Sequence, residues 1–283
     1  MSWIKVFAHD IRCGLLRWRY LLAPGLVILE CFYLGDEAMF RGISPSLADM
    51  VLYIFRGKEP IVGLDIGNAV ELPLPWLLVM GGILLLNLDY MLYDLTNAGQ
   101  QVILRSRSRT GWFLGKCLWN LMSTALCFCV MLLTAATAAL CFGGGLSLLN
   151  HPDLSYYLFG PLAEGEITLT WAQTLMAGLL APFLTIAALS MLQMTLCLFM
   201  KPVFSFLICE AQLILALFWK SPFCLGEGAM VMRSAWVATD YYGPEYAGVS
   251  TNVSAVFALA VLIVCVAAGT FKFRHTDILG LEE

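Results

Sequence analysis

The sequence predicts an all-helical protein that crosses a membrane several times. Hydrophobic residues make up 60% of the chain and charged residues only 13%, whereas a soluble domain carries about 25% charged residues. The mean hydropathy is +0.81, and apolar runs long enough to cross a bilayer recur along the chain. The net charge of −4 gives no indication of nucleic-acid binding. We therefore expect one transmembrane domain over residues 1–283, surrounded by membrane lipids.

The N-terminal segment 2–19 is predicted to be an amphipathic helix in the inner membrane interface. Its basic residues fall largely away from its apolar face. Apolar residues at helical spacing opposite a basic face are typical of helices that lie flat on a membrane. The residues that form this apolar face are Ile4, Phe7, Ile11, Leu15 and Trp18.

Six membrane spans are predicted from the apolar runs. Pro182 predicts a kink in the fourth span. Residues 47–55 are too short to cross a bilayer, and we expect a small helix on the outer surface there. Residues 220–252 also hold only short apolar pieces, so an outer re-entrant or interfacial segment is expected. The spans lie at about 20–35, 74–95, 117–142, 171–200, 203–219 and 253–271.

The distribution of basic residues predicts which side of the membrane each loop occupies. Eleven of the 16 Lys and Arg residues fall in the N-terminal segment, the loop after the second span, the turn at Lys201 and the C-terminal tail. Short loops that retain Lys and Arg stay in the cytoplasm. We therefore expect both termini to be cytoplasmic and the membrane to be a bacterial plasma membrane.

The loop at 97–116 is the most distinctive stretch of the chain. It holds Arg105, Arg107, Arg109 and Lys116 but no acidic residue. Apolar patches on both sides of the Arg/Ser core suit a short surface helix that offers its other face to a partner. A simple topological anchor explains the same basic residues equally well.

These features together resemble the membrane subunit of a type-2 ATP-binding-cassette (ABC) exporter. The closest local likeness is QQVILRSRSRTGWFLGK at 100–116, which is similar to the family's cytoplasmic coupling region, and the ending at 272–283 is similar to its short tails. The resemblance implies a separate ATPase subunit as partner and a second permease copy, or a related permease, that completes the pathway. The implied coupling residues are Gln101, Arg105, Arg107, Arg109, Trp112 and Lys116.

No cofactor or catalytic site is predicted in the chain itself. A G-x-x-x-x-G-K-[ST] motif is missing from the sequence, so the resemblance implies that ATP and Mg are bound by the partner ATPase. The three histidines fall in different segments and no catalytic constellation is apparent. We therefore expect neither a metal site nor enzymatic activity.

Glu30, Asp89 and Glu210 are acidic residues within predicted spans. An ionisable group inside a bilayer is costly and usually faces a cavity or a partner. We expect these acids to line a substrate pathway for a peptide or lipid-like amphiphile, with a preference for cationic cargo. The alternative is that they only hydrogen-bond neighbouring helices together.

Three other functions stay open at the level of sequence. The chain could be a membrane-embedded sensor or signalling module coupled to an ATPase, although its outer loops are modest for that role. A secondary transporter is less favoured because no internal repeat is visible. An intramembrane enzyme would require clustered catalytic residues, which the sequence lacks.

Overall fold

The computed structural model describes residues 20, 22–60, 72–88, 90, 94, 109–160, 165–242, 246 and 248–275. Within these residues the chain is all-helical, and its only β-type pairing is an isolated bridge between Ser234 and Val249. The α-helices are α2 (Leu22–Phe40), α3 (Leu47–Ile54), α4 (Leu74–Asn87), α7 (Arg109–Cys141), α8 (Ser155–Phe159), α9 (Trp171–Thr174), α10 (Ala181–Leu196), α11 (Pro202–Phe218), α12 (Ala235–Tyr241) and α13 (Thr251–His275). Short 3-10 turns occur at η4 (Pro152–Leu154), η6 (Glu227–Ala229) and η7 (Val231–Arg233), and η5 (Leu175–Leu180) is a π-helix.

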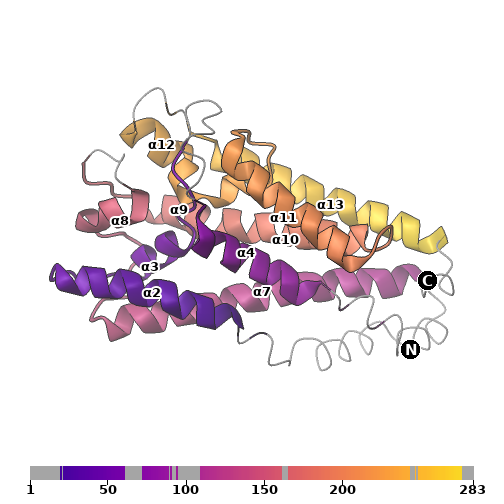
Figure 1. The fold of residues 1–283 in the computed structure, drawn as a ribbon, viewed down its shortest axis with the longest axis horizontal. Helices are drawn as coiled ribbons and strands as arrows, with labels where there is room; N and C mark the ends of the chain where they lie inside the picture. The colour runs from indigo at the N-terminus through magenta and orange to yellow at the C-terminus, as the bar shows by residue number, and fades with distance from the viewer. Residues whose placement is uncertain are drawn as a thin grey trace.

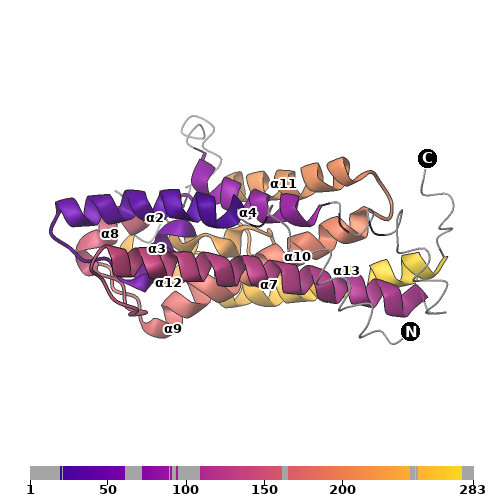
Figure 2. The ribbon, with the colours of Figure 1, turned by 90° about the horizontal axis from the view of Figure 1, so that it is seen from below.

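The long helices run along one common axis and form an elongated bundle (Figure 1). Seen from below, α2, α4 and α11 lie on one side and α7 and α13 on the other, with α10 between them (Figure 2). In agreement with this arrangement, α10 contacts α4, α7, α11 and α13. The core of the molecule therefore forms around α10, and the other long helices each expose one apolar side.

Three helical runs are long and apolar enough to cross a membrane: Arg109–Cys141, Trp171–Leu196 and Thr251–His275. Helix α4, with 14 residues, and α11, with 17, are apolar but shorter. A 14-residue helix is about 21 Å long, less than the roughly 30 Å of a bilayer core. Helix α2 has 19 residues but includes three acids. The all-helical fold is confirmed, and six spans remain a prediction.

The fourth predicted span is interrupted where the sequence places a proline. The π-helix η5 directly precedes α10, whose first turn contains Pro182. Proline lacks the N–H that would continue the α-helical ladder, and a π turn is one way to accommodate this loss. A Cβ at Gly178 in η5 would lie 3.1 Å from Val51 of α3, so the glycine allows close packing there.

Helix α3 forms where residues 47–55 predict a short helix, but it does not lie on a surface. Seven of its eight residues, from Ala48 to Ile54, are buried. The helix contacts α2, α7, α8 and η5, so it is enclosed in the bundle (Figure 1). The expectation of a surface helix was wrong because the apolar residues of α3 pack against its neighbours, and its one acid, Asp49, is hydrogen-bonded within the chain.

Residues 220–252 fold back onto the bundle through short elements. Within this segment η6 contacts α10, α11 and α13, and the indole N–H of Trp76 in α4 donates to the carbonyl of Ala229 at 3.2 Å. The predicted interfacial helix at 2–19, most of the basic loop and the tail after His275 lie outside the described residues.

Candidate functional site

The described end of the basic loop lies at one end of the bundle. Arg109 begins α7 and is exposed, and its Nη1 donates to the carbonyl of Arg274 in the last turn of α13 at 3.5 Å. Lys272 of α13 lies over the ring of Phe199, which follows α10, at 4.9 Å. The start of α7, the end of α10 and the end of α13 therefore meet at one end. Gln101, Arg105 and Arg107 lie outside the described residues.

Trp112 and Lys116, predicted to contact a partner, are both buried within the chain. Trp112 is 2% exposed and stacks on Phe273 of α13 with ring centroids 5.1 Å apart. Phe113 packs on the same ring at 5.7 Å. Of the three predicted coupling residues that the structure describes, only Arg109 presents an exposed side chain.

Lys116 forms an ion pair inside the bundle. Its Nζ lies 2.8 Å from Oδ2 of Asp94, and the two side chains are 0% and 10% exposed. The ammonium also lies 4.8 Å from the ring centroid of Tyr90 and 5.2 Å from that of Trp112. Tyr90 in turn stacks on Trp119 at 3.7 Å. A carboxylate and two aromatic faces thus surround a cation that has lost its water.

A hydrogen-bonded cluster connects α4, α7 and α10 next to this ion pair. Asn87 of α4 donates to Thr124 of α7 at 3.3 Å and to Ser190 of α10 at 3.0 Å, and it accepts from Ser123. Ser190 donates to the Asn120 side chain at 2.6 Å. All five side chains are buried. We call Asn87, Asn120, Ser123, Thr124 and Ser190 the polar cluster.

Two of the three acids predicted to lie within spans are on the side of the bundle formed by α2, α4 and α11. Glu30 of α2 and Glu210 of α11 are both partly buried, and Asp89 lies outside the described residues. A Cβ at Gly81 of α4 would come within 2.4 Å of Oε1 of Glu210, so this carboxylate rests directly on the α4 backbone. That oxygen is buried without a hydrogen-bond partner among the described residues.

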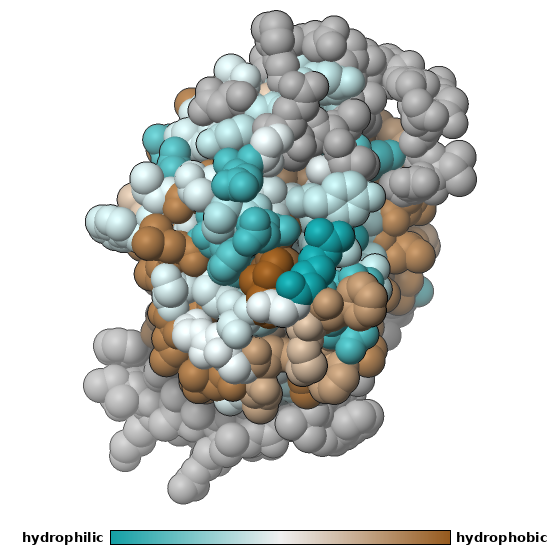
Figure 3. Space-filling view, turned by 90° about the vertical axis from the view of Figure 1, so that its left-hand side faces the viewer, coloured by the Kyte–Doolittle hydropathy of each residue, from teal (hydrophilic) through white to brown (hydrophobic). Residues whose placement is uncertain are grey.

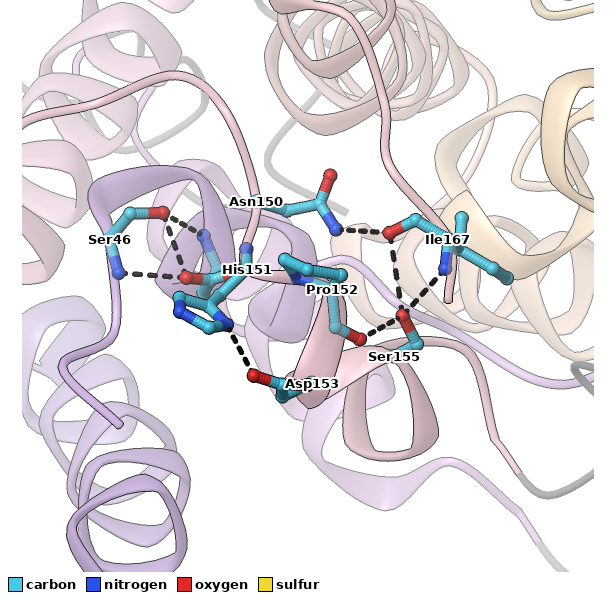
Figure 4. Close-up of polar contacts among 8 residues, drawn as sticks. Ser46, Asn150, His151, Pro152, Asp153, Ser155 and Ile167 are labelled. Atoms are coloured by element: carbon cyan, nitrogen blue, oxygen red, sulfur yellow. Dashed lines mark hydrogen bonds and ion pairs between the residues drawn. The ribbon is translucent and has the colours of Figure 1, made fainter. Parts of the chain in front are cut away.

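The opposite end of the bundle is held by a second hydrogen-bonded junction. The surface there carries hydrophilic residues at its centre and hydrophobic ones toward its sides (Figure 3). Beneath it, Asp49 accepts from the N–H groups of Ser46 and His151, each at 2.8 Å. Asn150 donates to Ile167, and the Ile167 N–H donates to Ser155 (Figure 4). Burial raises the pKa of Asp49, and these hydrogen bonds partly oppose the rise.

This junction has a structural role, because its donors and acceptors are used within the chain. Ser46 and Asp49 form a capping box that satisfies each other's N–H groups at the start of α3. The connection through His151 and Asn150 then fixes the loop between α7 and α9 on that cap.

Sequence reasoning did not find the buried arginine in the segment after α11. Arg233 is 3% exposed. Its Nη1 donates to Glu227 at 2.9 Å and to the carbonyl of Ala216 at 2.6 Å, while Nη2 donates to Leu217 at 2.8 Å. The only sequence signal is a lone Arg within the apolar stretch 229–238 and an acid six residues before it.

Among the described residues, no group of three or more His, Cys, Asp or Glu side chains could hold a metal ion. The side chains of the polar cluster there form hydrogen bonds between helices. The expectation that the chain binds neither metal nor cofactor stays a prediction.

The helical bundle and its long apolar helices define the chain as a helical membrane protein. Residues 50–279 match the model of a family described as "Protein of unknown function (DUF2705)", and the chain belongs to this family. The match runs from α3 to α13 and leaves out α2. No curated protein and no solved structure matches the chain.

Proposed function

We propose that the chain is the membrane-spanning permease subunit of an ATP-driven ABC exporter, working with separate ATPase subunits and a second permease. The observation that carries this proposal is the position of the basic residues. Arg109 and Arg274 meet at the end of the bundle where α10 also ends. A basic end of this kind faces the cytoplasm, where an ATPase would bind. The basic loop leads directly into α7.

The proposed transport path lies along the side formed by α2, α4 and α11. Glu30 and Glu210 are partly buried on this side, and large apolar side chains are exposed beside them, including Leu29, Leu78 and Leu207. Acids within an apolar surface suit a cargo that carries both hydrocarbon and a cationic group. A peptide or lipid-like amphiphile has this chemistry, and the second permease would cover the other side of the path.

The proposal is tested by purifying the chain from its native membrane and identifying the ATPase that accompanies it. We expect an ABC ATPase to co-purify. Replacing Arg105, Arg107 and Arg109 together by Ala should abolish either that association or cargo-stimulated ATP turnover. A matched control is Arg41→Ala, because Arg41 is an exposed arginine at the opposite end of the bundle. Absence of any ATPase from the wild-type preparation would contradict the proposal.

A further inference from the structure

The ion pair between Asp94 and Lys116 joins the two sides of the basic loop. Asp94 comes just before the basic loop predicted at 97–116, and Lys116 is its last residue, about two turns into α7. The 2.8 Å contact therefore closes the base of the loop. Because Lys116 is fully buried and Asp94 nearly so, separating the two charges would remove a close ion pair in a medium of low polarity. The two ends of the loop are thereby held at a fixed spacing.

Lys116 lies on the same face of α7 as three residues of the polar cluster. Residues spaced by three or four positions lie on one side of a helix. In α7, Lys116 is followed at this spacing by Asn120, Ser123 and Thr124. The polar cluster then continues from Asn120 and Asn87 to Ser190 of α10. On α7, Lys116 therefore shares one face with residues that bond this helix to α4 and α10.

We propose that Asp94 and Lys116 form a clamp that fastens the chain ahead of the basic loop to α7, so that Asp94, α4, α7 and α10 move as one body. A force applied at Asp94 reaches α7 through the ion pair, and it reaches α10 through the hydrogen bond between Asn120 and Ser190. That the force comes from an ATPase rests on the proposed function. The clamp itself follows from the contacts within the chain. Asp94 is accordingly a positioning residue. Lys116 acts through the same ion pair and does not itself contact the ATPase.

The test compares four variants of the complete complex in lipid nanodiscs. Asp94→Asn and Lys116→Met each break the pair, and the two changes together remove both charges. Exchange of the two residues, Asp94→Lys with Lys116→Asp, restores a pair of opposite polarity. Lys201→Met serves as control, because Lys201 is an exposed lysine at the same end of the bundle. Two quantities are measured: cargo-stimulated ATP turnover, and amide hydrogen exchange at residues 109–117, the start of α7.

We expect both single variants to retain the ATPase but to lose coupled turnover. Amide exchange at the start of α7 should become about tenfold faster, because local opening no longer breaks a buried ion pair. The exchanged pair should recover most of both properties, and Lys201→Met should match the wild type. Recovery by the exchanged pair separates a lost clamp from a misfolded protein.

Two results would overturn the clamp. One is unchanged coupling and exchange in both single variants, and the other is wild-type behaviour when both charges are absent. If no ATPase accompanies the wild type, the proposed function fails, whereas amide exchange in the isolated chain still decides whether the pair holds the start of α7.

Discussion

Arg233 donates to Glu227 across 2.9 Å while the same guanidinium reaches the last carbonyls of α11. Those carbonyls have no partner within their own helix, and Arg233 satisfies two of them. Its Nε also donates to the carbonyl of Lys58 at 3.2 Å. A single buried side chain therefore joins the end of α11, the segment after it and the stretch that follows α3.

Removing this guanidinium should be among the most destabilising changes in the chain. We expect Arg233→Met to lower the free energy of unfolding by about 3–5 kcal/mol, because Glu227 would be left as an unpaired buried charge. Lys220→Met is the matched control, since Lys220 is exposed and lies in the same segment. Denaturation in mixed micelles measures both, and equal stability of the two variants would refute the role assigned to Arg233.

Adjacent glycines in α4 should respond differently to the same substitution. A Cβ at Gly81 would meet Oε1 of Glu210 at 2.4 Å, whereas a Cβ at Gly82 finds only Leu26, at 3.8 Å. We expect Gly82→Ala to be neutral or to stabilise the helix by up to about 1 kcal/mol. Gly81→Ala should be destabilising relative to Gly82→Ala, by roughly 0.5–1.5 kcal/mol, because the carboxylate at the end of the Glu210 side chain must move out of its preferred rotamer.

The cause of that difference can be isolated with a double-mutant cycle. Adding Glu210→Ala should remove most of the cost of Gly81→Ala, because the carboxylate that the new methyl group displaces is then absent. The same second change should leave the effect of Gly82→Ala unaltered. Additive effects at Gly81 and Glu210 would show that the carboxylate does not rest on α4.

The polar cluster should contribute measurably to stability inside the bundle. Asn87 bonds three side chains on two other helices, so Asn87→Leu leaves Ser123, Thr124 and Ser190 short of a partner. Hydrogen bonds between membrane helices contribute about 0.6 kcal/mol on average and up to about 1.7. We therefore expect a loss of roughly 1–3 kcal/mol for the three bonds together. Thr137→Ala in α7 should change nothing, because Thr137 is exposed and bonds only within its own helix.

Long apolar runs were the most predictable part of this chain. Their length and composition depend on local sequence alone, and α7, α10 and α13 form where such runs occur. Pro182 likewise marks the interruption at η5, because the loss of its N–H is a local effect. The short helix at α3 was predicted as a helix for the same reason.

Burial of polar residues was not predictable, because it depends on contacts between segments far apart in the chain. Lys116 has the sequence context of an exposed loop lysine, and only its pairing with Asp94, 22 positions earlier, explains a side chain with 0% exposure. Arg233 is similar, since its acceptors at Lys58 and Ala216 come from two distant segments. Whether Glu30 and Glu210 serve transport or packing is undecided by sequence for the same reason.

Cysteine labelling tests the proposed orientation of the bundle and the packing of its outer segment together. Cys141 ends α7 and is exposed, while Cys224 is 7% exposed. Burial raises the pKa of the Cys224 thiol to about 11, and the thiolate is the reactive form. A membrane-impermeant maleimide at neutral pH should therefore label Cys141 in intact cells and leave Cys224 unmodified. In Arg233→Met, Cys224 should become reactive, because the segment that encloses it loses its anchor. Failure to label Cys141 would place that end of α7 in the cytoplasm and reverse the topology.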